Sequence, residues 1–368
     1  VGGSEEAVIF LSRELALIGY WVEVYLDPRV ADIGRDDWGV YWYPCSYFNL
    51  VTVPTIDVFV AWRYHISTAL VIPSFTDDVT HPKDRLSSSE TRGSSPKVFV
   101  WLQDVPSTVT YTSPAFSSHL SGIFCLSRFH ASYLPAPARE KAIITPNGID
   151  PNYFADGPND ATTFVYSSAP NRGLDTVLRS WPEIKRRLGP SAELLVYYGF
   201  SDSFMKYGRS TMKDFDAWHA EMMEMLQYNG VSYHGMVDHK TLAQGFARSG
   251  FILYPTTFPE TGCVTLMKAQ AMGCIPITTR YAGSTLPELT EPFDLGPRPL
   301  NHSLERDPDW LGSWIDAVVH ASRRNSEIGE LEKLENHRAE MKANTRSRFL
   351  WSKVALSWDE AFSVETPE

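Results

Sequence analysis

The sequence predicts an α/β protein of two domains, each built on a mostly parallel sheet. Its 368 residues suffice for about two domains at the usual ~150 residues each. Short β-branched and aromatic runs alternate with amphipathic stretches, most regularly after residue 161, and this alternation is typical of β-α-β units. The segment 135–160 is rich in Pro, Asn, Asp and Gly, so we place the end of the first domain at 159.

The first domain, 1–159, is predicted to begin with a helix and to continue mainly as strands. Val8, Leu11 and Leu15 recur at helical spacing, and Gly19 is a suitable stop. The expected strands are 20–26, 39–43, 57–62, 97–102, 122–126 and 141–145. The polar, Ser-rich segment 79–96 predicts a mobile surface loop. Since α/β units usually open with a strand, we expect one upstream of the first helix, missing from this sequence.

The second domain, 160–347, shows the β-α-β rhythm more clearly. Its expected strands are 162–167, 193–198, 231–234, 251–255 and 275–279. Its expected helices are one that carries Leu174, Val177, Leu178, Trp181 and Ile184 on one face, and 211–228, 239–248 and 264–272. The final segment, 348–368, contains an amphipathic helix over 352–363.

Charge and composition exclude several classes of function. With 33 basic and 44 acidic residues the net charge is −11, which argues against general affinity for nucleic acid or for anionic membranes. No apolar run reaches the ~18 residues of a membrane span, and no signal peptide opens the sequence. We expect a cytoplasmic protein, or one peripheral to the cytoplasmic face of a membrane. The four cysteines lie far apart and are expected to be buried, reduced residues.

Two strand-to-helix turns of the second domain carry residues suited to hold a phosphate. The turn 164–173 contains Arg172, whose fork of N–H donors fits phosphate oxygens. The turn 255–265 contains Glu260 and Gly262 and opens a helix, where free N–H groups and the positive dipole end favour an anion. Such turns occur in any α/β domain, so these residues alone leave a purely structural role open.

Other common catalytic sites find little support in the sequence. Asp-x-Asp pairs at 214–216 and 307–309 have the spacing of a metal site, but the first lies in a charged helical stretch and the second at a helix start, where Asp is an ordinary cap. His234 and His239 have no third zinc ligand nearby. No G-x-S-x-G elbow is present, and Cys263 is expected to pack as a small residue. We therefore expect no metal site.

Several stretches, taken in order, resemble family 4 retaining glycosyltransferases. The run 255–279 is similar to the family's signature. The other matching stretches are Gly2-Gly3-Ser4-Glu5, Trp101-Leu102-Gln103-Asp104, Ile144-Thr145-Pro146-Asn147-Gly148-Ile149-Asp150, Ala169-Pro170-Asn171-Arg172-Gly173-Leu174 and Phe349-Leu350-Trp351-Ser352-Lys353-Val354. The resemblance spans nearly the whole chain. It implies a GT-B fold of two facing Rossmann-like domains, with a last helix that crosses back to the first domain.

The resemblance also implies site residues and a substrate class. Arg172 would neutralise the diphosphate of a UDP- or GDP-linked sugar, and Glu260, the first carboxylate of the family's E-x7-E pattern, would contact the transferred sugar; these are the catalytic candidates. The implied donor-binding residues are Gly2, Gly3, Ser167, Asn171, Tyr233, Gly235, Met236, Val237, Thr261, Gly262, Cys263, Val264, Thr265 and Lys268. On the acceptor side stand Gln103, Asp104 and Arg128. No cofactor is implied, and the acceptor is a carbohydrate, lipid or protein.

Three positions depart from the family pattern and keep a second function open. Lys268 replaces the second Glu of E-x7-E, and an ammonium has no acceptor for ribose hydroxyls. Ser167 replaces a frequent arginine, and Gln103 replaces a frequent histidine. The leading hypothesis is a retaining, metal-independent glycosyltransferase of carbohydrate biosynthesis. The alternative is an idle relative that serves as a structural or binding subunit of a larger assembly; a sugar-nucleotide epimerase of the same fold has no specific residue support.

Overall fold

The chain divides into two compact units, which we describe separately. The computed structural model describes residues 3–48, 56–63, 96–324 and 329–364. Unit 1 comprises Val1–Gly148 with Leu350–Glu368, and unit 2 comprises Ile149–Phe349. The sequence analysis places the boundary at residue 159, but the first segment of unit 1 ends at Gly148. The boundary is earlier because Ile149 is buried in the core of unit 2 and Phe154 packs against that core.

The described part of unit 1 contains two sheets and several mostly short helices. Its elements are α1 (Gly3–Leu17), β1 (Glu23–Leu26), η1 (Val30–Asp32), β2 (Gly34–Arg35), β3 (Tyr41–Pro44), η2 (Cys45–Tyr47), β4 (Val58–Trp62), β5 (Lys97–Trp101), α2 (Thr108–Tyr111), α3 (Pro114–Ser118), β6 (Gly122–Cys125), α4 (Arg128–Ser132), α5 (Ala136–Arg139), β7 (Ala142–Ile144) and α14 (Trp351–Ser363). Strands β4-β5-β6-β7 form a parallel sheet in that order. In the smaller sheet, β3 pairs with β1 in parallel and with β2 antiparallel.

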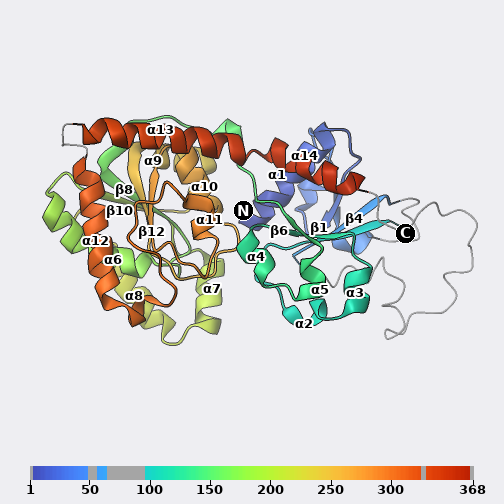
Figure 1. Ribbon diagram of the computed structural model, residues 1–368, viewed down its shortest axis with the longest axis horizontal. Helices are drawn as coiled ribbons and strands as arrows, with labels where there is room; N and C mark the ends of the chain where they lie inside the picture. The colour runs from blue at the N-terminus through green and yellow to red at the C-terminus, as the bar shows by residue number, and fades with distance from the viewer. Residues whose placement is uncertain (1–2, 49–55, 64–95, 325–328, 365–368) are drawn as a thin grey trace, which may run out of the picture. The chain divides into compact units, whose positions relative to one another are not determined.

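The larger sheet of unit 1 is covered on both faces, and alternate residues of β5 face the two layers. Val98 and Val100 join a core cluster with residues of α2, α3, α4 and α5, whereas Phe99 and Trp101 join a second cluster with α1 and α14 (Figure 1). This period of two is what a strand buried on both faces requires. The C-terminal helix α14 thus contributes to the core of the unit that begins with α1.

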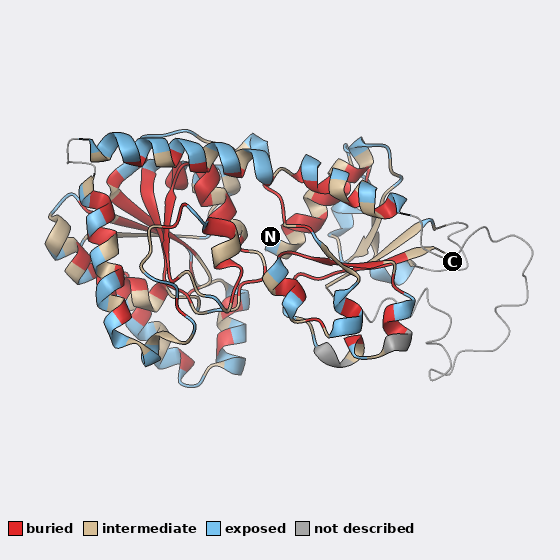
Figure 2. Ribbon diagram, viewed as in Figure 1, coloured by how far each residue is buried: buried red, intermediate tan, exposed pale blue. Residues whose placement is uncertain are grey.

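Unit 2 is a doubly covered parallel sheet. Its elements are η5 (Pro151–Tyr153), β8 (Asp160–Ser168), α6 (Leu174–Leu188), β9 (Glu193–Tyr198), α7 (Asp202–Thr211), α8 (Phe215–Met225), β10 (Val231–Gly235), α9 (His239–Arg248), β11 (Ser249–Tyr254), α10 (Val264–Ala271), β12 (Ile275–Thr278), α11 (Leu286–Thr290), η6 (Leu304–Arg306), α12 (Pro308–Arg323) and α13 (Glu330–Arg348). The strand order is β10-β9-β8-β11-β12, and every pairing is parallel. These strands are largely buried, whereas α13 exposes much of its surface (Figure 2).

Most predicted elements of unit 2 are present, and the differences have local causes. The expected helix 211–228 is shorter, over Phe215–Met225, and a separate helix, α7, precedes it. Cys125, Cys263 and Cys274 are buried as predicted, but Cys45 is exposed because it lies in the surface turn η2. Of the predicted loop 79–96, all but residue 96 lies outside the described residues. None of the helices in the described ranges combines the length and apolar character needed to cross a bilayer.

Candidate functional site

The candidate site of unit 2 lies where its strand order reverses. From β8 the chain adds β9 and β10 on one side, and then β11 and β12 on the other. In open α/β sheets, the carboxyl ends of the strands beside such a switch point form the usual ligand crevice. The turn after β8 carries Arg172, and the loop after the adjacent β11 carries Glu260. The two catalytic candidates therefore meet at this edge of the sheet.

Arg172 and Glu260 form a partly buried ion pair. Arg172 Nη1 lies 2.9 Å from Glu260 Oε1 and 3.1 Å from Oε2. Tyr254, the last residue of β11, donates its hydroxyl to Glu260 Oε1 at 2.5 Å, and the Ser168 hydroxyl lies 3.1 Å from the Tyr254 hydroxyl. The Glu260 side chain is 6% exposed, whereas that of Arg172 is 33% exposed. The carboxylate is thus enclosed by the protein, while part of the Arg172 side chain is accessible to solvent.

The guanidinium of Arg172 is fixed but incompletely hydrogen-bonded. It lies over the Phe258 ring, 4.1 Å from the ring centroid. Its Nε is buried and has no hydrogen-bond partner among the described residues. Burial lowers the pKa of Arg172, but the charge of Glu260 outweighs it, so the net pKa is raised and the group stays cationic. A fixed cation with an unsatisfied donor is suited to an anionic ligand.

The start of α10 lies beside this pair and has no side-chain cap. Cys263 is the N-cap residue, and its side chain forms no capping hydrogen bond. Burial raises the pKa of the Cys263 thiol, so it remains a neutral thiol rather than a nucleophile. Thr265 donates its hydroxyl to the Ser167 carbonyl at 2.5 Å and so ties the helix start to the end of β8. Gly173, at φ +104°, has no room for a Cβ, which would stand 2.5 Å from the Pro255 carbonyl oxygen.

Lys268 lies further along α10, near residues of η5 and α9. Its Nζ is 3.3 Å from His239 Nδ1. It lines a small pocket of unit 2 with Asp150, Tyr153 and His239. Lys268 does not bond to Glu260, the other residue of the E-x7-E spacing: Glu260 is bonded by Arg172 and Tyr254, and Lys268 contacts His239.

The remaining donor-side candidates of unit 2 are spread along the same sheet edge. Tyr233 accepts a hydrogen bond from the Phe200 amide at 3.3 Å, so its hydroxyl is used to hold the turn after β9. Gly235 ends β10, the edge strand, which β9 separates from β8, and Met236 and Val237 follow it. Thr261 is buried, Gly262 and Val264 are half-buried, and Asn171 is exposed.

The acceptor-side candidates lie at the carboxyl ends of strands in unit 1. Gln103 is buried and exchanges two hydrogen bonds of 3.2 Å with the Asn147 amide. Asp104 is exposed and pairs with Arg63, which also pairs with Glu5 at the start of α1. Arg128 is exposed at the first position of α4. Gly3 begins α1, and Gly2 lies outside the described residues.

The sequence analysis does not predict two residues, Tyr254 and His130, that contact the candidate site residues. Tyr254 contacts Glu260, although its position in the strand run 251–255 indicates only a buried residue. His130 is fully buried, accepts from the Leu126 amide through Nδ1 at 3.2 Å and donates through Nε2 to the Asp104 carbonyl at 2.9 Å. Burial lowers the pKa of His130 to about 4, so the imidazole is neutral near pH 7. The sequence signal that could have indicated the position of His130 is the N-cap Ser127, which precedes it by one helical turn.

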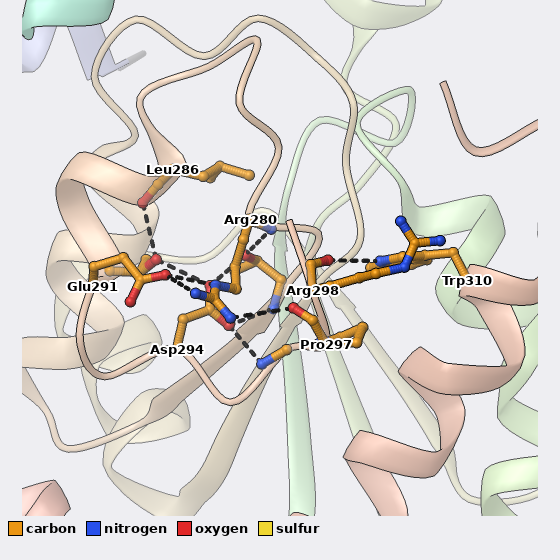
Figure 3. A network of polar contacts seen from close by, with 10 residues as sticks. Arg280, Leu286, Glu291, Asp294, Pro297, Arg298 and Trp310 are labelled. Atoms are coloured by element: carbon orange, nitrogen blue, oxygen red, sulfur yellow. Dashed lines mark hydrogen bonds and ion pairs between the residues drawn. The ribbon is translucent and has the colours of Figure 1, made fainter. Parts of the chain in front are cut away.

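A polar network closes the loop after β12. Asp294 is buried and accepts from the Thr278 and Gly296 amides at 3.1 and 2.8 Å, while Arg280 donates to Glu291 at 2.6 Å (Figure 3). Burial raises the pKa of Asp294 despite these hydrogen bonds. These hydrogen bonds tie the loop to the end of β12, the strand next to β11.

The two Asp-x-Asp pairs are engaged in other interactions. Asp216 pairs with Arg209, and Asp307 caps α12 and pairs with Arg298. Within the ranges that the structure describes, no three His, Cys, Asp or Glu side chains gather as a metal site would require.

Comparison with known proteins identifies the fold. A scan against family models finds no match, and neither does a search of curated proteins. Among similar solved structures, sucrose-phosphate synthase from Thermosynechococcus elongatus has a TM-score of 0.65 at 14% identity, over 98% of this chain and 93% of that one. The chain has a GT-B fold. A glycosyltransferase from Rickettsia africae gives a TM-score of 0.64 at 11% identity over 98% and 94% of the two chains, and Anabaena HepE in complex with UDP and glucose gives 0.52 at 14% over 73% and 72%.

Proposed function

We propose that this GT-B protein is a retaining glycosyltransferase that uses a nucleoside-diphosphate sugar. The observation that carries the proposal is the Arg172–Glu260–Tyr254 cluster at the switch point, beside the uncapped start of α10. The cluster combines a fixed cation, a hydrogen-bonded carboxylate and free backbone donors. These are the groups that a diphosphate and an attached sugar need. HepE, whose structure contains UDP and glucose, shares the fold and supports this substrate class.

In the proposed reaction, Arg172 and the first N–H groups of α10 bind the diphosphate. The bond between the sugar and the phosphate oxygen breaks while the acceptor hydroxyl attacks from the face that the leaving group vacates, and the proton of that hydroxyl passes to the departing phosphate oxygen. Negative charge then grows on the diphosphate, so preorganised donors stabilise the transition state more than the ground state. The proposal assigns this role to Arg172 and the helix, without metal or cofactor. Glu260 orients the sugar in this proposal, and the acceptor-side assignment of Gln103, Asp104 and Arg128 stays a prediction from the sequence.

The ion pair between Arg172 and Glu260 has a consequence for donor binding. An incoming diphosphate competes with Glu260 for Arg172 and supplies an acceptor for its unsatisfied Nε. Glu260 keeps the hydroxyl of Tyr254 as a donor when Arg172 turns to the phosphate. The carboxylate is therefore never left without a hydrogen bond, and it becomes available to the sugar hydroxyls.

Calorimetric titration with UDP-glucose, GDP-mannose, UDP and uridine tests the phosphate site. We expect Arg172→Ala to weaken binding of the diphosphates at least tenfold and of uridine little, because a charge-assisted hydrogen bond contributes ~1.5–3 kcal/mol. Arg179→Ala is the matched control, since Arg179 forms an exposed ion pair with Glu221 in the same unit. Equal losses for UDP and uridine would place Arg172 outside the phosphate site.

The idle alternative is favoured by one specific observation. Lys268, which stands where the family has an acceptor carboxylate, lies beside His239 and presents donors instead. Release of UDP from UDP-glucose, followed over hours with water or a glycan mixture as acceptor, separates the two hypotheses. Turnover that Arg172→Ala abolishes supports the enzyme. No thermal shift with any UDP- or GDP-sugar at millimolar concentration supports the idle subunit.

A further inference from the structure

An exposed aromatic surface lies on the small sheet side of unit 1, and none of its residues belongs to the candidate site described above. Trp21 is 72% exposed and Trp38 is 47% exposed. With Tyr41 and Arg35 they surround one cavity, and we call these four residues the aromatic platform. Exposed tryptophans gathered around a cavity are uncommon on soluble proteins and indicate a binding surface.

Trp21 is held rigidly although it is exposed. Its ring stacks on Tyr41, with centroids 4.5 Å apart and an interplanar angle of 21°. Its Nε1 donates to Glu23 Oε1 at 3.0 Å, and Tyr25 donates to the other oxygen of Glu23 at 2.6 Å. Since one face of the indole is covered by Tyr41 and the residue is so exposed, its other face is open to solvent. A fixed, open ring face can stack with little loss of conformational entropy.

Trp38 is presented by an equally ordered turn between β2 and β3. The Asp36 carboxylate accepts from the Trp38 and Val40 amides, both at 3.0 Å, and from Trp42 Nε1 at 3.1 Å. Arg13 adds an ion pair to the same carboxylate at 3.2 Å. The turn is therefore fixed by a single side chain before any ligand binds.

Arg35 supplies the polar part of the platform. Its guanidinium carbon lies 5.9 Å from the Tyr41 ring centroid. Arg35 lines the cavity, and among the residues that the structure describes it has no ion-pair partner. The cavity has a volume of about 220 Å³ and also borders Gly19, where a Cβ would meet no atom within 4 Å. This is a size for a single ring rather than a drug-sized molecule, whose sites span ~300–1,000 Å³.

The platform is remote from the acceptor-side candidates of unit 1. Glu5, in the first turn of α1, pairs with Arg63 beside Asp104, whereas the platform borders Ala16 and Gly19 at the other end of α1. A 15-residue helix is ~22 Å long. The two sites are therefore separated by the length of this helix.

We propose that the aromatic platform binds a pyranose unit of a glycan. A pyranose ring offers an apolar C–H face and a rim of hydroxyl oxygens. Stacked rings match the face, and the unpaired fork of Arg35 matches the oxygens of the rim. A polar cavity framed by rigid rings fits this chemistry better than the flat apolar core of a protein interface. The proposal does not depend on catalysis, because it concerns binding alone.

The test uses calorimetric titration of the full chain with maltohexaose, cellohexaose, chitohexaose and a hyaluronan hexasaccharide. We expect at least one to bind, and Trp21→Ala and Trp38→Ala each to weaken that binding at least tenfold. Tyr47→Ala is the control, because Tyr47 is an exposed aromatic of the same unit outside the cavity. If the wild type prefers hyaluronan and Arg35→Gln removes that preference, Arg35 binds a carboxylate of the glycan. If neutral glycans bind as tightly as hyaluronan, Arg35 binds hydroxyl groups.

The same experiment separates this proposal from the proposed catalytic function. Arg172→Ala should leave hexasaccharide binding unchanged while it weakens binding of UDP-sugars at least tenfold. No binding of any hexasaccharide at 10 mM (on the order of 3 kcal/mol of binding free energy), or equal binding by the wild type and both tryptophan variants, would overturn the glycan proposal. So would a Trp21→Ala variant that only changes the oligomeric state, since the platform would then be an interface for a second copy.

Discussion

Acidification should weaken unit 1 through one buried histidine. His130 has a pKa of about 4 in the folded protein and about 6.5 in an unfolded chain. Between these values the unfolded chain binds the additional proton, so stability is full above pH 6.5 and is lost as the pH falls toward 4. The full shift corresponds to about 3 kcal/mol, of which about 2 kcal/mol is lost between pH 7 and pH 5. Protonation of His130 would put a proton on Nδ1, which then could no longer accept the hydrogen bond from the Leu126 amide.

Urea unfolding at pH 7 and pH 5, read by pulsed hydrogen exchange of the segment 122–134, measures this effect locally. His130→Gln keeps a donor and an acceptor but does not titrate, so we expect its stability to change by about 2 kcal/mol less over this pH interval than that of the wild type. His234→Gln is the control, because His234 is exposed and belongs to unit 2. If wild type and His130→Gln lose equal stability between pH 7 and pH 5, the reasoning is wrong.

Two further substitutions probe the donor pocket and the unit 1 core. Lys268→Glu should change the affinity for, or the preference among, UDP- and GDP-sugars more than tenfold, whereas the exposed Lys240→Glu should not; unchanged binding of every donor would refute a role for Lys268. Gly148→Ala should destabilise unit 1 by about 1–3 kcal/mol in urea unfolding, because the added Cβ would stand 2.5 Å from the Trp351 ring. Gly312→Ala, a position with nothing within 4 Å, should not destabilise the protein, and a similar loss in both would contradict the packing argument.

The sequence predicts the sheet of unit 2 well because most of its strands are buried apolar runs that alternate with amphipathic helices. Asp238, which directly precedes the expected helix 239–248, caps α9 by accepting from the Thr241 amide. Helix α7 is not predicted, because Gly208 and the nearby Ser and Thr residues have weak helix propensity. Phe215 packs against Gly208 and stabilises α7 through a contact that no local pattern indicates.

The candidate site is predictable in its position but not in its bonding. Arg172 and Glu260 follow strands that prove adjacent, so the β-α-β pattern suffices to bring them to one edge. Their pairing with each other, and the hydroxyl of Tyr254 on Glu260, depend on how two loops fold back over the sheet. Lys268 is on α10 as predicted. Its contact with His239, 29 residues earlier in the chain, depends on how α9 and α10 pack together, which no local pattern indicates.

The packing of α14 constrains the order in which the chain can fold during synthesis. Trp358 stacks on Phe124 with centroids 3.9 Å apart, so the first unit to be translated needs a helix from the far end of the chain. Unit 2 is one continuous segment and can complete its core while α14 is still being made. Until then, the side of the unit 1 sheet that carries Phe99 and Trp101 lacks its C-terminal cover and exposes aromatic surface. Synthesis proceeds at ~5–20 residues per second, and unit 1 is most exposed to aggregation in the interval before α14 is made. We expect a chaperone to bind unit 1 in that interval.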